Sequence, residues 1–369
     1  EADQIGLGRS DYVIERAFRA EGWDVAGEVA WDLGDRNTLT GGADWSRTNL
    51  ALPTYSEAYV AGPRAGTAQT REPQGGFQRL DNVGAYVQAV YYPAEPLGVT
   101  VNLRDDENSV YGNSFTQRLG LVYLLGDDLA AKALYGSAFK APSAPQLFGT
   151  PLIFGDIVGN KDLKPERAST IEAGVQYTPG RALDLTGNVY YTHVADRITF
   201  ETVGGNPRAT NQGELDSAGV ESILKWRWRF LTGRVAAALQ TTVLAATADR
   251  TARQADWEPY PALLGSAGVG APLLDWPLRL WAEARHAGAV PTTQSNFVAN
   301  GHVRYDVPAV TVMDVALSSR ELYWFGDRET LLSVKVSNVF DAQEVAPGFG
   351  GVDYPGLGRT VLVRLTQTF

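Results

Sequence analysis

The residues best suited to chemistry in this chain are charged side chains that recur at alternate positions. Those that share one parity within their segments are Arg118, Glu172, Glu221, Lys225, Arg227, Arg229, Arg279, Glu283, Lys335 and Arg364. Between 208 and 230 the opposite parity is apolar, with Leu224, Trp226 and Trp228. Because the side chains of a strand alternate between its two faces, these charges line a wet face opposite an apolar one. Such charges can contact a second polar body or channel water, or pair with one another to brace the wall, and the sequence leaves both open.

Catalytic and metal-binding patterns are missing from the sequence. It contains no phosphate loop, no nucleophile elbow and no HExxH motif. His286 and His302 flank one expected loop and have the chemistry to ligate a metal, but solvated surface histidines are the favoured interpretation. The acidic run 105–108 offers oxygen ligands without the spacing of a calcium loop. We therefore predict no enzyme activity, no metal site and no cofactor.

Composition narrows the class of protein further. The 369 residues include no cysteine, which excludes disulfides and thiolate metal sites. A net charge of -10 without basic clusters argues against a nucleic-acid partner. No apolar run approaches the roughly 18 residues that a membrane helix needs. A mean hydropathy of -0.17 is still compatible with a membrane barrel, whose strands expose only alternate residues to lipid.

The elements that position the charged residues are predicted to be strands. Leu183, Leu185 and Val189 alternate with Asp184 and Asn188, which gives one apolar and one polar face. The candidate strands are 14–33, 35–47, 81–92, 96–105, 115–125, 129–140, 168–178, 182–201, 208–230, 233–247, 260–272, 277–287, 309–322, 329–340 and 359–369, with 5–9 as a possible sixteenth. The fold class is therefore all-β.

Two kinds of connection join these strands. Short turns alternate with long loops at roughly 49–80, 141–167, 247–259, 288–308 and 342–357. Short turns on one rim and long loops on the other are typical of outer-membrane barrels. Aromatic residues gather within about five residues of the short turns, which indicates a girdle at one membrane interface. The terminal strand 359–369 alternates in the same way and ends on Phe369. We predict a transmembrane antiparallel β-barrel of about 15–16 strands, with 1–369 as one domain.

Four segments carry a family resemblance, in order along the chain. They are 135–143 (YGSAFKAPS), 159–167 (GNKDLKPER), 211–213 with 218–221 (NQG and AGVE), and 336–341 with 355–359 (VSNVFD and PGLGR). Together they resemble the C-terminal barrel region of TonB-dependent outer-membrane receptors. The second differs from the usual family segment at Lys161, where a proline is common.

The resemblance implies a place in a 22-stranded barrel in the outer membrane of a Gram-negative bacterium. Fifteen strands fall short of that number, and neither a plug domain nor an energy-coupling box is recognisable in the sequence. We therefore expect outer-membrane lipid around the wall, a plug domain or companion chain to complete it, and a TonB-type energy-coupling protein if a plug exists.

The implied function is active uptake of a scarce nutrient chelate, such as a siderophore–iron complex or cobalamin. Aromatic residues of the expected outer loops are the candidate ligand contacts: Tyr55, Tyr59, Phe77, Trp257, Phe297, Tyr305 and Tyr354. Two alternatives use the same fold without active transport, namely a structural or assembly barrel within a larger complex and an ungated pore.

Overall fold

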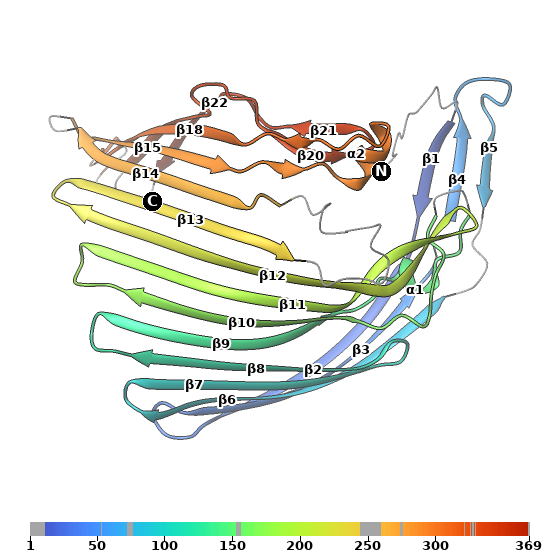
Figure 1. Cartoon of the computed structure of the whole chain (residues 1–369), viewed down its shortest axis with the longest axis horizontal. Coiled ribbons are helices and arrows are strands. Elements are labelled where there is room, and N and C mark those ends of the chain that lie inside the picture. The colour runs from blue at the N-terminus through green and yellow to red at the C-terminus, as the bar shows by residue number, and fades with distance from the viewer. Residues whose placement is uncertain are drawn as a thin grey trace.

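One antiparallel sheet of fifteen strands makes up most of the molecule. The computed structural model describes residues 12–52, 54–71, 77–152, 156–243, 260–273, 276–320, 322–324, 326, 328 and 330–367. In sheet order the strands are β2 (Ala20–Asp32), β3 (Thr38–Leu50), β6 (Gln78–Ala94), β7 (Leu97–Asn108), β8 (Gly112–Leu124), β9 (Leu129–Lys140), β10 (Glu166–Tyr177), β11 (Leu183–Val203), β12 (Asn206–Trp228), β13 (Leu231–Val243), β14 (Leu263–Leu273), β15 (Leu278–Ala287), β18 (Val310–Ser319), β19 (Thr330–Ser337) and β22 (Thr360–Gln367). Figure 1 shows this sheet curling into a wall.

The predicted all-β antiparallel barrel fold is confirmed. The strand count did not decide whether the first and last strands of the sheet pair with each other. β2 and β22 lie at the two ends of the sheet, and no pairing among the described residues joins them. The expected strand at 5–9 and the terminal Phe369 lie outside the described residues. The wall is therefore open between β2 and β22.

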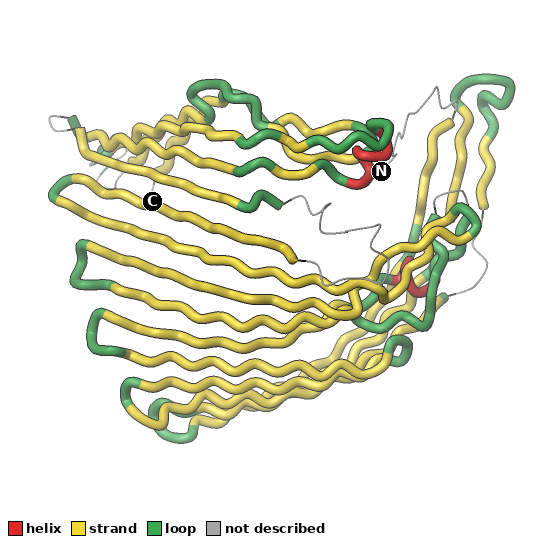
Figure 2. Tube along the Cα trace, viewed as in Figure 1, coloured by secondary structure: helices red, strands yellow, loops and turns green. Residues whose placement is uncertain are grey.

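Several expected loops contain regular structure of their own. The predicted strand 14–33 divides into β1 (Tyr12–Ala17) and β2, and β1 pairs with β4 (Thr54–Tyr59), which pairs with β5 (Ala68–Arg71). Short hairpins form from β16 (Val290–Pro291) with β17 (Asp306–Val307), and from β20 (Val345–Phe349) with β21 (Val352–Pro355). These elements gather at the long-loop end, together with α1 (Ala144–Phe148) and α2 (Gln294–Ala299) (Figure 2). Neither helix is long or apolar enough to cross a membrane.

Strand register divides the sheet into two chemically different faces. Directly opposed residues of antiparallel strands share a face, and Asp44, Gly84, Asp106 and Ser114 are opposed in turn across β3, β6, β7 and β8. We call this side the polar face. The other side, the apolar face, carries exposed residues such as Val189, which is 50% exposed. In a membrane barrel the polar face lines the interior and the apolar face meets lipid.

Much of the aromatic girdle lies at the short-turn end of the apolar face. Trp31, Tyr123 and Trp228 are exposed there, near the turns that Figure 2 shows at one end of the strands. Trp281 instead lies on the polar face, because its partner in the register is Gly270. Its ring occupies the room above Gly270 and Gly268 that side chains would otherwise fill. Alternation also predicts this face, because Trp281 shares its parity with Arg279 and Glu283.

Candidate functional site

Most of the predicted charged residues converge on the polar face. Register places Arg118, Glu172, Glu221, Lys225, Arg227, Arg279, Glu283, Lys335 and Arg364 on it. Arg229 does not follow them. It lies in the turn after β12 with a φ of 54°, and its guanidinium carbon is 5.2 Å from the centre of the Trp228 ring. The strand parity ends at Trp228, so the expected position of Arg229 was wrong.

Ion pairs between neighbouring strands brace part of this face. Lys132 Nζ is 3.1 Å from Glu172 Oε1, and Lys225 Nζ is 3.3 Å from Asp184 Oδ2. Lys335 Nζ is 2.9 Å from Asp314 Oδ2, and Asp314 is buried, with 5% of its surface exposed. A charge that is removed from water needs such a partner. Glu172, Lys225 and Lys335 therefore form ion pairs with other residues of the wall, which is one of the two roles that the sequence left open.

A denser network on β2, β3, β6 and β7 was not predicted from the sequence. Arg104 donates to both oxygens of Asp106 at 2.7 Å and lies 2.9 Å from Asp44. The Tyr86 hydroxyl donates to Glu28 across the intervening strand. Tyr86 reaches that far because Gly42 beneath its ring has no side chain. Alternation places Arg104 on the polar side, but only the register reveals its partners.

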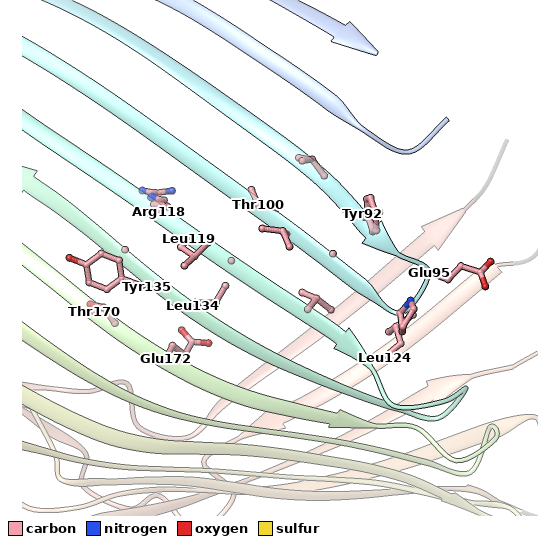
Figure 3. A pocket seen from close by; sticks show the side chains of 17 residues that line it. Tyr92, Glu95, Thr100, Arg118, Leu119, Leu124, Leu134, Tyr135, Thr170 and Glu172 are labelled. Carbon is pink, nitrogen blue, oxygen red and sulfur yellow. The ribbon is translucent and has the colours of Figure 1, made fainter. Parts of the chain in front are cut away.

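A hollow of about 700 Å³ opens on the wall beside Arg118 and Glu172. Gly98, Gly120 and Gly136 occupy the polar face here, so no side chains fill the space. Figure 3 shows Arg118 of β8 and Thr170 and Glu172 of β10 around it, with β9 between the two strands. Glu172 pairs with Lys132, whereas no ion pair of Arg118 exists within the described part of the chain. The hollow therefore presents an uncompensated cation.

Two of the expected ligand contacts are buried. Tyr55 and Tyr59, on β4, are only 2% and 7% exposed. The Tyr59 hydroxyl donates to Glu57 at 2.6 Å, which raises the pKa of Tyr59, and the Arg64 guanidinium stacks 4.0 Å above its ring. Arg71 in turn donates to the Leu152 carbonyl at 3.0 Å. These tyrosines stabilise a small outer sheet and expose little surface to a ligand.

Phe297 and Tyr305 belong to a connection between two outer loops. Asn296, which is fully buried, donates through its amide to the Tyr305 hydroxyl at 3.2 Å and to Asp353 at 2.8 Å. The Tyr305 hydroxyl donates to the other oxygen of Asp353 at 3.0 Å. The Phe297 ring meets His302 edge-on. We call the trio Asn296, Tyr305 and Asp353 the loop latch, because it joins the loop before β18 to the loop before β22.

The remaining aromatic candidates differ in accessibility. Phe77 and Tyr354 are each 57% exposed at the long-loop end. Trp257 lies outside the described residues. Phe77 and Tyr354 therefore remain the described candidates with surface available to a ligand.

The family-like segments meet one another in space. Asn211 accepts from the Lys164 backbone nitrogen at 2.8 Å and donates to the Lys164 carbonyl at 2.9 Å. Asn160 donates to the Ala209 carbonyl at 2.9 Å. In the last pair of family-like segments, 336–341 and 355–359, Asp341 accepts from the Arg359 backbone nitrogen at 2.7 Å. These side chains hold loops closed by hydrogen bonding to distant backbone groups. This structural role explains why asparagine and aspartate occupy these positions.

The other polar residues considered as metal ligands, the acidic run 105–108 and the two loop histidines, do not come together in one site. The run 105–108 alternates between faces, so Asp106 lies on the polar face while Asp105 accepts from Asn113 on the apolar face at 2.8 Å. His286 contacts Thr311 at 2.9 Å, whereas His302 contacts Phe297. The described residues contain no group of three or more acidic, histidine or cysteine side chains arranged to hold a metal ion.

Comparison with known proteins places this architecture in a family. A family model described as TonB dependent receptor-like, beta-barrel, matches residues 4–339. The vitamin B12 transporter BtuB of Vibrio vulnificus strain CMCP6 is 28% identical over 209 residues, which are 53% of this chain and 30% of that protein. BtuB of Vibrio cholerae strain M66-2 is 26% identical over 270 residues, which are 73% of this chain and 39% of that protein.

Solved receptors share the fold. The siderophore receptor PirA from Acinetobacter baumannii superposes with a TM-score of 0.70 at 17% identity, over 95% of this chain and 55% of PirA. The FrpB iron transporter from Neisseria meningitidis gives 0.69 at 16% identity, over 94% of this chain and 54% of FrpB. This chain thus spans about half the length of those structures. Because the family model covers most of its length, the chain belongs to the TonB-dependent receptor-like β-barrel family of Gram-negative outer membranes.

Proposed function

We propose that this chain forms the wall of a receptor for active uptake of a scarce nutrient chelate, either a siderophore–iron complex or a cobalamin-like ligand. The family consists of receptors and transporters, not enzymes. The observation that carries the proposal is the polar face, which continues across fifteen paired strands in a chain that the family model matches from 4 to 339. The relatives include vitamin B12 transporters, and the solved neighbours include siderophore receptors.

The proposal includes a polar body against this face. A plug domain or companion chain would complete the barrel interior, and a TonB-type protein would couple energy to it if a plug exists. Support comes from Arg118, which has no ion-pair partner within the described residues although it lines the hollow of the wall. An arginine without an ion-pair partner is available to pair with a carboxylate of an incoming polar body.

The outer loops are proposed to supply ligand contacts through Phe77 and Tyr354. Aromatic side chains offer large contact area at low entropic cost. The loop latch supports this role for Tyr354, because it holds the neighbouring Asp353 in a fixed position. A preorganised loop loses less conformational freedom when a ligand binds.

Uptake by cells tests the proposal. The complete product of the gene would be expressed in a Gram-negative host that lacks its own siderophore and B12 receptors. Uptake of radiolabelled ferric enterobactin and of cyanocobalamin would be measured with and without the energy-coupling protein. We expect uptake of one of them only when coupling is intact. Equal uptake without coupling would indicate an ungated pore, and no uptake of a panel of chelates would favour a structural barrel.

Tyr354→Ala sharpens the same assay. We expect it to weaken chelate binding about tenfold through the loss of aromatic contact area. Tyr323→Ala is a matched control, because Tyr323 is equally exposed at 57% but lies near the short-turn end. Equal losses in both variants would contradict a binding role for Tyr354.

A further inference from the structure

A hollow on the opposite, apolar face has no role in the function proposed above. It measures about 240 Å³ and lies between β8, β9, β10 and β11 at their long-loop ends. Its lining includes Phe115, Ser137, Phe139, Arg167, Ser169 and His193. Its lining combines one cation, two hydroxyls, one imidazole and two phenyl rings.

Register shows that the polar members are neighbours. Ser169 lies directly opposite Ser137 on one side and His193 on the other. Arg167 occupies the next position of this face toward the long loops, opposite Phe139. One position toward the short turns lies Ile171, opposite Tyr135 and Tyr191. Along β10, the polar residues Arg167 and Ser169 therefore lie on the long-loop side of this face and Ile171 lies on the short-turn side, while Phe139 lies beside Arg167.

The two tyrosines mark a boundary between these groups. The Tyr191 hydroxyl donates to Asp216 at 2.6 Å, and Gln117 donates to the Tyr135 hydroxyl at 3.4 Å. Tyrosine with its ring in lipid and its hydroxyl among polar groups is the typical residue of a membrane interface.

The length of β10 places Arg167 at the outer interface. Ten residues separate it from Tyr177 of the girdle at the short-turn end. At a rise of about 3.3 Å per residue and a strand tilt of about 40°, this distance is roughly 25 Å along the membrane normal. The apolar band of outer-membrane barrels is also about 25 Å tall. Arg167 therefore lies at the level of the lipid headgroups of the outer leaflet.

The charges around the hollow leave Arg167 available. Its side chain is exposed, and no ion pair of Arg167 exists within the described residues. The nearby Asp216 already accepts from Tyr191 and lies 2.8 Å from His193 Nδ1. Arg47 on the same face differs, because it is paired with Asp81 at 2.7 Å.

We propose that this hollow binds the phosphate group of a phosphorylated lipid in the outer leaflet. The Arg167 guanidinium donates to the phosphate, since arginine is suited to two parallel hydrogen bonds with such a group. Ser169 and His193 lie close enough along the sheet to add donors. The acyl chains then extend over Ile171 toward the girdle. The site depends on the membrane position of the wall, not on transport.

Lipid retention tests the site. The purified full-length protein would be delipidated in detergent and incubated with bisphosphorylated lipid A, with its dephosphorylated form, or with inorganic phosphate, and analysed by native mass spectrometry. We expect one bisphosphorylated lipid to be retained and the dephosphorylated lipid to be lost. Arg167→Gln should reduce retention about tenfold through the loss of a charged hydrogen bond. Arg167→Lys, which keeps the charge, should retain more lipid than Arg167→Gln.

Controls make each outcome decisive. Arg47→Gln should leave retention unchanged, because that arginine is already paired. Heat-dependent gel migration would verify that each variant is folded. Equal retention of the dephosphorylated lipid, or unchanged retention by folded Arg167→Gln, would overturn the proposal. Displacement of the lipid by equimolar inorganic phosphate would instead identify a general anion site and overturn the lipid assignment.

Discussion

At the level of single residues, the face that a side chain occupies determines the cost of a charge. Val189 is 50% exposed on the apolar face, and its register partners Ala173 and Val220 are also apolar or small. Val189→Arg should destabilise the barrel by about 2–4 kcal/mol, the cost of an arginine near the middle of the bilayer. Urea unfolding in lipid vesicles, followed by gel migration, measures the change.

The matched control is Gln176→Arg on the polar face. Gln176 is also exposed but shares a face with Thr186 and Glu172. We expect almost unchanged stability, because an arginine there meets water. Similar losses in both variants would show that the assigned faces are wrong.

A second residue-level prediction concerns Asn211, which joins two family-like segments. Its amide makes hydrogen bonds with the backbone of Lys164 and donates to the Asp196 carbonyl at 2.7 Å. Asn211→Ala leaves these backbone groups without partners, at a cost of about 1–3 kcal/mol. Hydrogen exchange between 156 and 167 should accelerate. Gln212→Ala, at an exposed neighbouring position, should not change it.

At the level of elements, the loop latch makes two outer loops one unit. Asn296 is buried and also accepts from the Gly351 backbone nitrogen at 2.8 Å, so α2 depends on the β20–β21 hairpin. We expect Asn296→Ala to increase hydrogen exchange in 345–355 by about tenfold or more, because buried polar partners become unsatisfied. Folding of the barrel strands should be unaffected.

Asn300→Ala is the control for the latch. Its amide donates to the Val303 carbonyl at 3.2 Å within its own loop. Local exchange near 300 is expected to rise while 345–355 stays protected. Unchanged protection of 345–355 in Asn296→Ala would mean that the two loops are held together by other contacts.

At the level of the whole molecule, the open wall between β2 and β22 leads to a prediction about the barrel. Unpaired backbone groups at two strand edges are costly in lipid. We therefore propose that further strands, from a longer chain or a companion, fill the gap. Cysteines at Val29 of β2 and Val363 of β22 should not be joined by a short thiol crosslinker within one chain.

The chain contains no cysteine, so only the two introduced thiols can react with the crosslinker. Cysteines at Val334 and Val363, which are opposed in the register of β19 and β22, provide the positive control. Efficient crosslinking of the β2–β22 pair within one chain would establish a reduced barrel that closes on itself.

The alternation of residue types along the chain is enough to predict the strands and their faces. A period of two depends only on the geometry of a strand, so it identifies the faces of nine charged residues, including Arg118 and Lys335. It also predicts fifteen strands, the number found in the main sheet. The division between short turns and long loops follows from glycine, proline and polar clusters, which act locally.

The contacts between distant residues, in contrast, depend on the tertiary structure. Arg104 finds Asp44 through strand register, and Asn296 finds Asp353 across a long stretch of sequence. Tyr55 and Tyr59 have the sequence surroundings of free loop aromatics, yet a small sheet formed with β1 buries them. Local pattern fixes the direction in which a side chain leaves its own strand. Its partner depends on which distant segment packs there, and that is a property of the whole fold.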